Sequence, residues 1–212
     1  MLTWINLVLL FFAMTMIEPP KKYLALGDSY TIGESVAEAD RWPNQLVRAL
    51  EAKGKRYEMP KIIATTGWRT DNLRAAMDGA QLSPEYDLVS LLIGVNNQYQ
   101  GKSVQAYEGE FTDLLQRAVK LARRKKENVF VVSIPDYGFT PFGEKKQAEI
   151  TQAIDAFNAV NKAITEKAGI RYVNITDISR EGLVKPEYVA DDKLHPSGVM
   201  YQKWVERIVK VF

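Results

Sequence analysis

A chain of 212 residues is long enough to bury one substantial hydrophobic core, and its mixture of apolar and charged residues is ordinary for a globular domain. Lys and Arg number 28 against 26 Asp and Glu, so no strong field of one sign arises and the charge gives little support for nucleic-acid binding. There is no cysteine, which excludes disulfides, thiolate catalysis and cysteine zinc sites. A single domain that binds a small or neutral ligand is therefore expected.

The chain opens with an apolar segment. Residues 2–17 read LTWINLVLLFFAMTMI, apolar except for Thr and Asn, and the run ends before Glu18 and two prolines. It is short for a membrane-spanning helix, which needs about 20 apolar residues, and it suits the apolar region of a secretory signal. We therefore expect residues 1–20 to be a signal for export to the periplasm or outside the cell, and residues 21–212 to form one domain.

Two alternatives for this segment stay open. No Lys or Arg precedes the run, and the best small-residue cleavage pattern, Ala13-Met14-Thr15, is poor. An uncleaved anchor that associates with a membrane through residues 1–17 is therefore the rival to a cleaved signal. The other alternative is a helix or strand packed on the domain, which is disfavoured because a run without a polar face rarely packs at a surface.

Beyond Lys22, short apolar runs alternate with longer segments of helical periodicity. In chain order, the pattern predicts a strand at 23–26 (YLAL), a helix at 41–54, a strand at 62–65 (IIAT), a helix at 72–80 behind the cap Thr70-Asp71-Asn72, and a strand at 86–94 (YDLVSLLIG). It then predicts a helix at 103–126 with the basic run RRKK as its solvated end, a strand at 128–135 (NVFVVSIP), a helix at 143–169, a strand at 170–175 (IRYVNI) and a helix at 195–212. The last helix is expected to present one apolar face made of Met200, Trp204, Ile208 and Val211.

This alternation favours a three-layer α/β/α domain. Parallel strands need crossover connections, which helices supply on both faces of a sheet, and strands that are buried on both sides read as unbroken apolar runs. A parallel five-stranded sheet is therefore expected, with its functional site at the carboxyl ends of the strands. The segments that follow the first four strands are GDS, TTGWRTDN, GVNN and PDYGFTPFG.

The only histidine in the sequence is His195, in the segment DDKLHPSG. A serine nucleophile needs a base, which is usually an imidazole that a carboxylate orients. Asp192 stands three residues before His195, so one helical turn would bring its carboxylate to the ring, and Asp191 is a less favoured substitute. Ser29, after the first strand, is the candidate nucleophile. On spacing alone, a turn serine and a chance D-x-x-H pair remain the simpler explanation.

Four segments together resemble the signature blocks of one enzyme family, the SGNH or GDSL hydrolases. GDSYTIGES around Ser29 is similar to the first block, and Gly67 in ATTGWRTDNL stands where the glycine of the second block would be. GVNN resembles the third, G-x-N block, and DDKLHPSG resembles the fourth, D-x-x-H block. The blocks occur in the family's order and at predicted strand ends, so the resemblance covers the chain from Tyr23 onward. It implies a flavodoxin-like fold and the hydrolysis of esters.

The resemblance also implies a role for each matching residue. Ser29 would be the nucleophile, His195 the general base and then acid, and Asp192 the carboxylate that orients the imidazole. The backbone N–H groups of Ser29 and Gly67 and the side-chain amide of Asn96 would form the oxyanion hole. Neutral donors suit this task because a tetrahedral acyl intermediate carries a negative charge on the former carbonyl oxygen.

Other positions carry weaker signals. Asn97 stands where the third block commonly has Asp, which puts any role of that carboxylate in doubt. Trp68 and Arg69 are expected to serve as packing and as a helix-start charge, and Glu34 as a solvated or locally capping residue. No phosphate-binding glycine loop and no clustered histidines occur, so neither a cofactor nor a metal is expected. The loop after the fourth strand could line an acyl or alcohol pocket, or only close the core edge, with Asp136, Tyr137, Phe139 and Phe142.

The sequence therefore predicts a serine hydrolase that cleaves carboxylic esters through an acyl-enzyme on Ser29. Its substrate is a small-molecule ester: a small acyl ester, an acetylated sugar or a lysophospholipid, which the sequence does not rank. Two alternatives stay open, an acyltransferase on the same triad and a non-catalytic carbohydrate- or protein-binding domain of the same fold. The oligomeric state is left undefined.

Overall fold

The computed structural model describes residues 18–212 of the chain. The expected signal or anchor, which falls on residues 1–17, lies outside the described residues. Across residues 18–212 no helix is both long enough and apolar enough to cross a membrane.

The centre of the domain is a sheet of five parallel strands in the order β2-β1-β3-β4-β5. This order is that of flavodoxin-like sheets, so the predicted fold class is confirmed. In the register, Leu26 lies opposite Ile63 on one side and Leu91 on the other. The strands are β1 Tyr23–Gly27, β2 Lys61–Ala64, β3 Leu88–Leu92, β4 Val129–Val132 and β5 Arg171–Val173.

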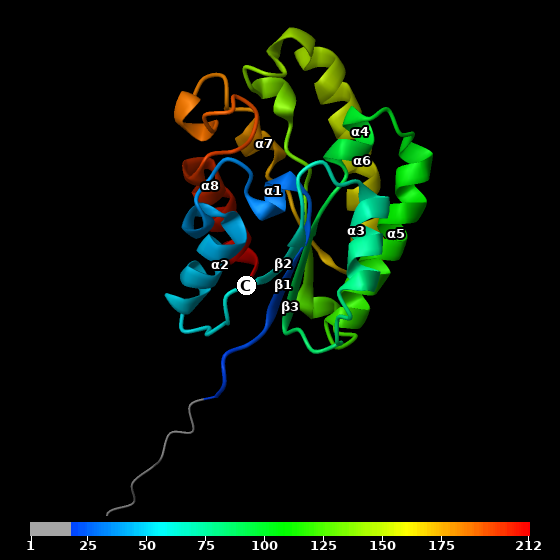
Figure 1. Cartoon of the computed structure of the whole chain (residues 1–212), viewed down its shortest axis with the longest axis vertical. Helices are drawn as coiled ribbons and strands as arrows, with labels where there is room; N and C mark the ends of the chain where they lie inside the picture. Colours follow the sequence, from blue (N-terminus) through cyan, green and yellow to red (C-terminus); the bar gives the residue numbers. More distant parts are fainter. Residues whose placement is uncertain (1–17) are drawn as a thin grey trace, which may run out of the picture.

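Helices cover both faces of this sheet, which gives three layers (Figure 1). On one face α2 packs against α8, and on the other α5 packs against α3 and α6. The α-helices of the described part are α1 Ser29–Ile32, α2 Trp42–Glu51, α3 Thr70–Gly79, α4 Val95–Tyr99, α5 Val104–Leu121, α6 Gln147–Lys167, α7 Thr176–Ser179 and α8 Gly198–Ile208. Short 3₁₀ turns are η1 Glu38–Asp40, η2 Lys126–Asn128, η3 Tyr137–Phe139, η4 Glu144–Lys146, η5 Pro186–Tyr188 and η6 Val209–Val211.

Two predicted helix ends are wrong. Helix α5 stops at Leu121, and Arg123 and Arg124 follow with left-handed φ values of 56° and 61°, so the basic run lies beyond the helix. The Arg123 guanidinium instead donates to the Glu85 carbonyl at 3.0 Å. Helix α8 ends at Ile208, so Val211 falls in a 3₁₀ turn and is 37% exposed, whereas Met200, Trp204 and Ile208 are buried as predicted.

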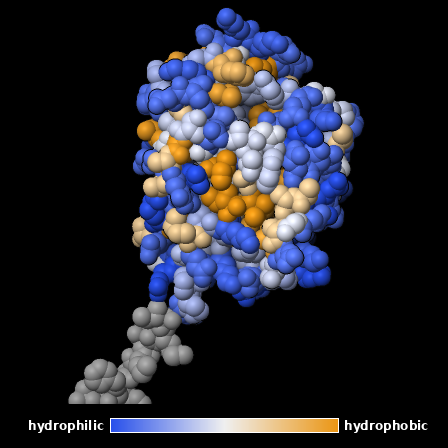
Figure 2. Space-filling model, viewed as in Figure 1, coloured by the Kyte–Doolittle hydropathy of each residue, from blue (hydrophilic) through white to orange (hydrophobic). Residues whose placement is uncertain are grey.

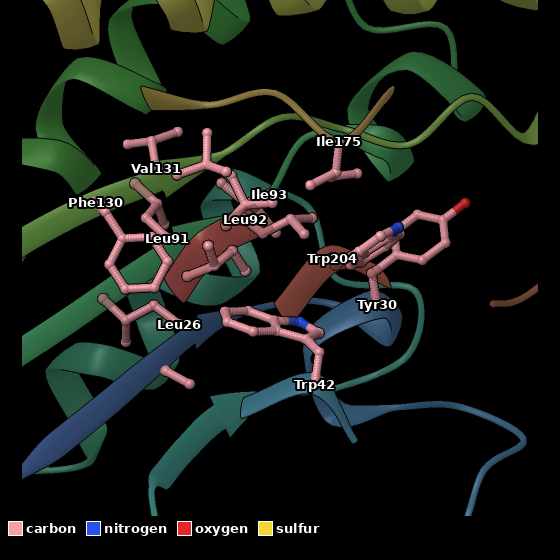
Figure 3. Close-up of a cluster of buried hydrophobic side chains, with 14 of the residues drawn as sticks. Leu26, Tyr30, Trp42, Leu91, Leu92, Ile93, Phe130, Val131, Ile175 and Trp204 are labelled. Atoms are coloured by element: carbon pink, nitrogen blue, oxygen red, sulfur yellow. The ribbon is translucent and has the colours of Figure 1, made fainter. Parts of the chain in front are cut away.

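The core beneath the carboxyl ends of β1 and β3 is rich in aromatic side chains. Trp42 of α2 and Trp204 of α8 are fully buried, and the Trp42 ring lies 6.3 Å from that of Phe130 on β4. Tyr30 of α1 packs beside Trp204, with 6.4 Å between ring centroids (Figure 3). Because cores are packed as densely as organic crystals, the contact of Tyr30 with Trp204 helps to hold α1 in place against α8.

Both ends of the described chain meet the loop between α2 and β2. The Lys21 N–H donates to the Arg56 carbonyl at 3.0 Å, and the Lys55 ammonium donates to the Phe212 carbonyl at 2.5 Å. These contacts lie at the amino ends of the strands. The loop leads into the edge strand β2, whose Ile62 and Ile63 are half-buried. Figure 2 shows apolar surface in the region where Figure 1 draws this strand.

Candidate active site

Ser29 lies where β1 turns into α1, at the carboxyl edge of the sheet. Asp28 caps the helix because its Oδ1 accepts the Tyr30 N–H at 3.1 Å, which makes Ser29 the first residue of α1. The helix ends after one turn at Gly33, whose φ is 70°. Ser29 itself is only 4% exposed. The cap at Asp28 and the turn at Gly33 thus fix Ser29 at the carboxyl ends of the strands, where functional sites of parallel sheets lie.

The capping carboxylate of Asp28 is fully buried, and its Oδ2 has no hydrogen-bond partner among the described residues. Burial raises the pKa of Asp28 to about 7, although the nearby N–H groups of Tyr30 and Gly94 act in the opposite direction. Directly beneath Ser29 there is therefore a carboxyl group that the fold keeps largely protonated below neutral pH.

His195 and Asp192 form a close pair, as the sequence predicts. The ring Nδ1 of His195 lies 2.6 Å from Asp192 Oδ2, while Asp192 Oδ1 accepts the backbone N–H groups of Leu194 and His195, each at 2.9 Å. The expected helical turn is wrong, because Lys193 has a φ of 67° and the carboxylate closes a side-chain turn instead. Asp191 is exposed and stays outside this cluster.

The hydrogen bonds around Asp192 control its ionisation. Its partial burial alone would raise the pKa, but the donors reverse this effect and hold the pKa at about 2. The donors are the Ser35 hydroxyl, the backbone N–H groups of His195 and Leu194, and the His195 ring. Asp192 is therefore ionised at every pH at which the fold is expected to work, and its charge faces the imidazole.

Packing fixes the His195 ring on its other side. The Tyr30 ring meets it edge-on, with 5.7 Å between ring centroids and an interplanar angle of 63°. Ser197 caps α8 directly after the histidine, with its hydroxyl accepting the Met200 N–H. The residue next to Ser29 thus also orients the predicted base.

Gly67 lies in the loop after β2, and Asn96 lies in the short helix α4 after β3. Gly67 has a φ of 84°, and no protein atom lies within 4 Å of the position a Cβ would take, so its left-handed backbone, rather than crowding, requires glycine. The Asn96 side chain donates from Nδ2 to the Trp68 carbonyl at 3.0 Å, which ties α4 to the loop that carries Gly67. Trp68 packs on the core and Arg69 starts α3 in an ion pair with Asp71, as expected.

Asn97 connects α4 to the start of α3. Its Oδ1 accepts the Thr70 N–H at 3.1 Å, and its Nδ2 donates to Thr70 Oγ1 at 2.6 Å and lies 3.4 Å from Glu110 Oε2. The Thr70 hydroxyl in turn donates to Glu110. An aspartate at this position would face the Glu110 carboxylate, so the network explains why an amide stands there.

The predicted residues meet in one pocket of about 300 Å³. Ser29, Gly67, Asn96 and His195 all line it. The rest of its wall is mostly apolar and consists of Tyr30, Thr66, Val95, Tyr99, Tyr137, Phe142 and Leu194. A larger, open groove between α2 and α8 contains none of the predicted residues. The 300 Å³ pocket is therefore the candidate active site.

Sequence reasoning identified only part of this wall. Tyr137 and Phe142 line the pocket, but Phe139 does not, and Asp136 instead lies 3.0 Å from the guanidinium Nε of Arg180. Glu34 makes a contact that the sequence did not predict: its partly exposed carboxylate accepts the hydroxyl of Thr66, 32 residues away. The lining residues that were missed are Tyr30, Thr66, Val95, Tyr99 and Leu194, and all of these except Tyr99 stand directly beside a motif residue in the sequence.

No group of three His, Asp or Glu side chains that could hold a metal ion occurs within residues 18–212. The pocket also brings together a serine hydroxyl, an imidazole with its carboxylate, and neutral N–H groups, which are groups that acyl transfer uses. Such a set of groups at the carboxyl edge of a parallel sheet is suited to the cleavage of acyl bonds.

Residues 25–203 match the GDSL-like lipase/acylhydrolase family, and the chain belongs to this family of carboxylic ester hydrolases. An arylesterase of Vibrio mimicus is 26% identical over 99% of this chain and 96% of its own length. Among solved structures, a lipase/acylhydrolase from Enterococcus faecalis is similar with a TM-score of 0.71, 18% identity, and coverage of 90% of this chain and 94% of that one. The acetylxylan esterase Axe2 from Geobacillus stearothermophilus gives a TM-score of 0.69, 18% identity, and coverage of 90% and 93%.

Proposed function

We propose that the protein hydrolyses carboxylic esters through an acyl-enzyme on Ser29, with His195 as base and Asp192 as its orienting carboxylate. The observation that carries this proposal is the 2.6 Å contact between His195 and Asp192, in a pocket that His195 shares with Ser29. An ionised carboxylate on Nδ1 leaves the other ring nitrogen free to accept a proton.

The reaction then has two steps. Ser29 Oγ attacks the ester carbonyl as His195 Nε2 accepts its proton, and the imidazolium returns that proton to the departing alcohol. In the second step, His195 accepts a proton from water, which attacks the acyl-enzyme and releases the acid. Asp192 stays ionised throughout, because its low pKa places its protonation far below the pH range of the reaction.

We assign the oxyanion hole to the backbone N–H groups of Ser29 and Gly67 and to Asn96 Nδ2. Ser29 opens α1, so no carbonyl within that helix can accept its N–H. Asn96 Nδ2 gives one hydrogen to the Trp68 carbonyl and retains a second for the substrate oxygen. Removal of one such donor typically costs about 2.7–4 kcal/mol of the activation free energy.

The pocket wall supports esters with short acyl or aryl groups as the preferred substrates. Tyr99, Tyr137 and Phe142 bring three aromatic rings within 6.4 Å of one another at the pocket. Such a surface suits an apolar group better than a sugar, which would need more hydrogen-bonding side chains. The arylesterase relative is in keeping with this preference.

The test is an activity panel of p-nitrophenyl esters, phenyl acetate, an acetylated xylo-oligosaccharide and a lysophospholipid. We expect Ser29→Ala to lower kcat at least about 1,000-fold on every substrate that the wild type cleaves, because the variant cannot form an acyl-enzyme. The matched control is Ser83→Ala, which alters an exposed serine before β3, at the amino end of the sheet. Equal turnover by the wild type and the Ser29 variant would rule out the proposal.

We propose further that residues 1–20 direct export and that residues 21–212 are the catalytic domain. The apolar sequence of residues 2–17 supports the first part, and the Lys21 backbone contact with Arg56 supports the boundary. N-terminal sequencing of the protein from its native host should show a start near residue 21. An intact N-terminus with recovery in the membrane fraction would favour the anchor instead.

A further inference from the structure

The loop that follows α1 is built on the carbonyl of Ser29. The N–H groups of Gly33 and Glu34 both donate to the Ser29 carbonyl at 3.0 Å. Gly33 and Ser35 have left-handed φ values of 70° and 64°. For a serine this conformation is uncommon and costs backbone strain, so tertiary contacts must hold it. The side chains of Glu34 and Ser35 supply such contacts.

Ser35 reaches the aspartate of the His–Asp pair. Its hydroxyl donates to Asp192 Oδ2 at 2.5 Å, and this is the same oxygen that lies 2.6 Å from His195 Nδ1. Asp192 Oδ1 is already occupied by two backbone N–H groups of its own loop. Ser35 is therefore the only side chain besides His195 that holds Asp192 among residues 18–212, and it comes from the segment that carries Ser29.

Glu34 reaches the opposite wall of the pocket. Its carboxylate accepts the hydroxyl of Thr66, which lines the pocket and directly precedes Gly67. Gly67 lies in a loop, where the backbone hydrogen bonds of a helix or a strand do not hold it. The bond from Thr66 to Glu34 therefore restrains the backbone that presents the Gly67 N–H. One short loop thus contacts three separate parts of the site.

We propose that Glu34 and Ser35 are positioning residues that align the Gly67 loop and Asp192 with Ser29. This inference rests on the proposed function, because it assigns to Glu34 and Ser35 the task of setting the geometry of that same site. Neither side chain lines the pocket, so both act through their partners rather than on the substrate. A positional error of about 1 Å in a catalytic group can lower the rate about 100-fold, which makes such restraints effective.

The Ser35 hydroxyl also moderates the charge on Asp192. As a donor, it draws electron density from Oδ2, the oxygen that faces the imidazole. Without it, Asp192 would stabilise the imidazolium more strongly, and the acidic limb of kcat/KM would move to higher pH. The other titratable side chain packed on the His195 ring is Tyr30, whose burial raises its pKa well above the usual range, so it stays neutral in this window.

The experiment compares Ser35→Ala, Ser35→Gly and Ser35→Asn with the Ser83→Ala control, using phenyl acetate from pH 5 to 9. We expect Ser35→Ala and Ser35→Gly to lower kcat about tenfold with little change in KM, and to shift the acidic limb upward. Ser35→Gly should at the same time raise Tm, since glycine relieves the left-handed strain. Ser35→Asn should restore most of the activity, because Asn tolerates this conformation and its amide can donate.

Glu34 is tested with a double-mutant cycle. Glu34→Ala and Thr66→Val, which keeps the shape of the threonine side chain, should each lower kcat several-fold. The double variant should be no slower than the slower single variant, since both changes remove the same hydrogen bond. Fully multiplicative losses would contradict a shared task for Glu34 and Thr66.

The outcomes separate this inference from the proposed function. If Ser29→Ala is inactive while Ser35→Ala and Glu34→Ala match the wild type in kcat and pH profile, the positioning roles are wrong and the catalytic proposal stands. A loss of kcat in Ser35→Ala that Ser35→Gly does not share would also overturn the role of the Ser35 hydroxyl. Full activity of Ser29→Ala overturns the catalytic proposal, and with it the site that Glu34 and Ser35 are proposed to align.

Discussion

At the residue scale, two adjacent aspartates offer a matched comparison. Asp192 contacts His195 Nδ1 at 2.6 Å, whereas Asp191 makes no hydrogen bond to His195 in the described structure. We expect Asp192→Asn to lower kcat about 1,000- to 10,000-fold, because an amide neither stabilises the imidazolium nor fixes the tautomer. Asp191→Asn should stay within a factor of about two. Steady-state kinetics on one ester decides the matter, and a larger loss in Asp191→Asn would transfer the role to Asp191.

Asn97 allows a second comparison at this scale. Asn97→Asp would place two carboxylates about one hydrogen-bond length apart, since Nδ2 now lies 3.4 Å from Glu110 Oε2. We expect this change to lower the free energy of unfolding by about 1–3 kcal/mol at neutral pH and by less at pH 4.5, where protonation relieves the repulsion. Adding Glu110→Gln should recover most of the loss. Urea unfolding of Asn97→Asp, Glu110→Gln and the double variant measures this. If Asn97→Asp costs as much stability in the Glu110→Gln background as beside the native Glu110, the explanation of the amide is wrong.

The residues brought to the pocket were predictable where the sequence leaves few choices. His195 is the only histidine, and Ser29, Gly67 and Asn96 each follow a strand whose carboxyl end must meet the others at one sheet edge. The contacts of Glu34 and Ser35 were not predictable. These contacts join residues that are 32 and 157 positions apart in the sequence, and the loop that makes them has left-handed backbone conformations. Neither hydrophobic periodicity nor turn composition predicts such tertiary pairs.

At the element scale, helix α1 couples the position of Ser29 to a buried acid. Burial raises the pKa of Asp28 to about 7, so the folded state keeps a proton that the unfolded chain loses above about pH 4. Stability from this group is therefore present at low pH and is lost as the pH rises from about 4 to 7. The loss approaches about 4 kcal/mol if the whole shift is realised.

Asp28→Asn tests this coupling, because its amide oxygen can still cap α1 but cannot ionise. We expect the free energy of unfolding of the wild type to fall relative to that of the variant between pH 4.5 and 7.5, and the two to run parallel above that range. Urea titrations at a series of pH values provide the measurement. Parallel curves over the whole range would show that Asp28 does not carry this pH dependence.

Elements with a strong apolar pattern were predicted well, and their ends were not. All five strands lie within the predicted runs to within a residue or two. The signal is strongest for β1, β3 and β4, because burial on both faces leaves an unbroken apolar run. The end of α5 was missed because Arg123 and Arg124 are good helix formers, yet the fold turns them into a loop that reaches Glu85. Tertiary hydrogen bonds override helix propensity there.

At the scale of the whole molecule, the pocket sets a limit on the acyl group. Each methylene buried on the apolar wall contributes about 0.8 kcal/mol, so kcat/KM should rise about fourfold per carbon until the pocket of about 300 Å³ is full and then level off. Phe142, which is 51% exposed, should be covered by the longer chains. We therefore expect Phe142→Ala to flatten the chain-length profile with little change for acetate esters.

The control for this prediction is Val184→Ala, which alters an apolar side chain that is 78% exposed and does not line the pocket. A series of p-nitrophenyl esters from two to twelve carbons supplies the measurement. The same profile for both variants would show that Phe142 does not contact the acyl group.

The two ends of the described chain bear on how the enzyme can be attached to something else. Both Lys21 and Phe212 contact the loop between α2 and β2, at the amino ends of the strands, whereas the pocket opens at the carboxyl ends. The described residues therefore begin and end on the side of the domain away from the pocket. An enzyme coupled to a bead, a fusion partner or a bilayer through either end would present its substrate entrance to the solvent.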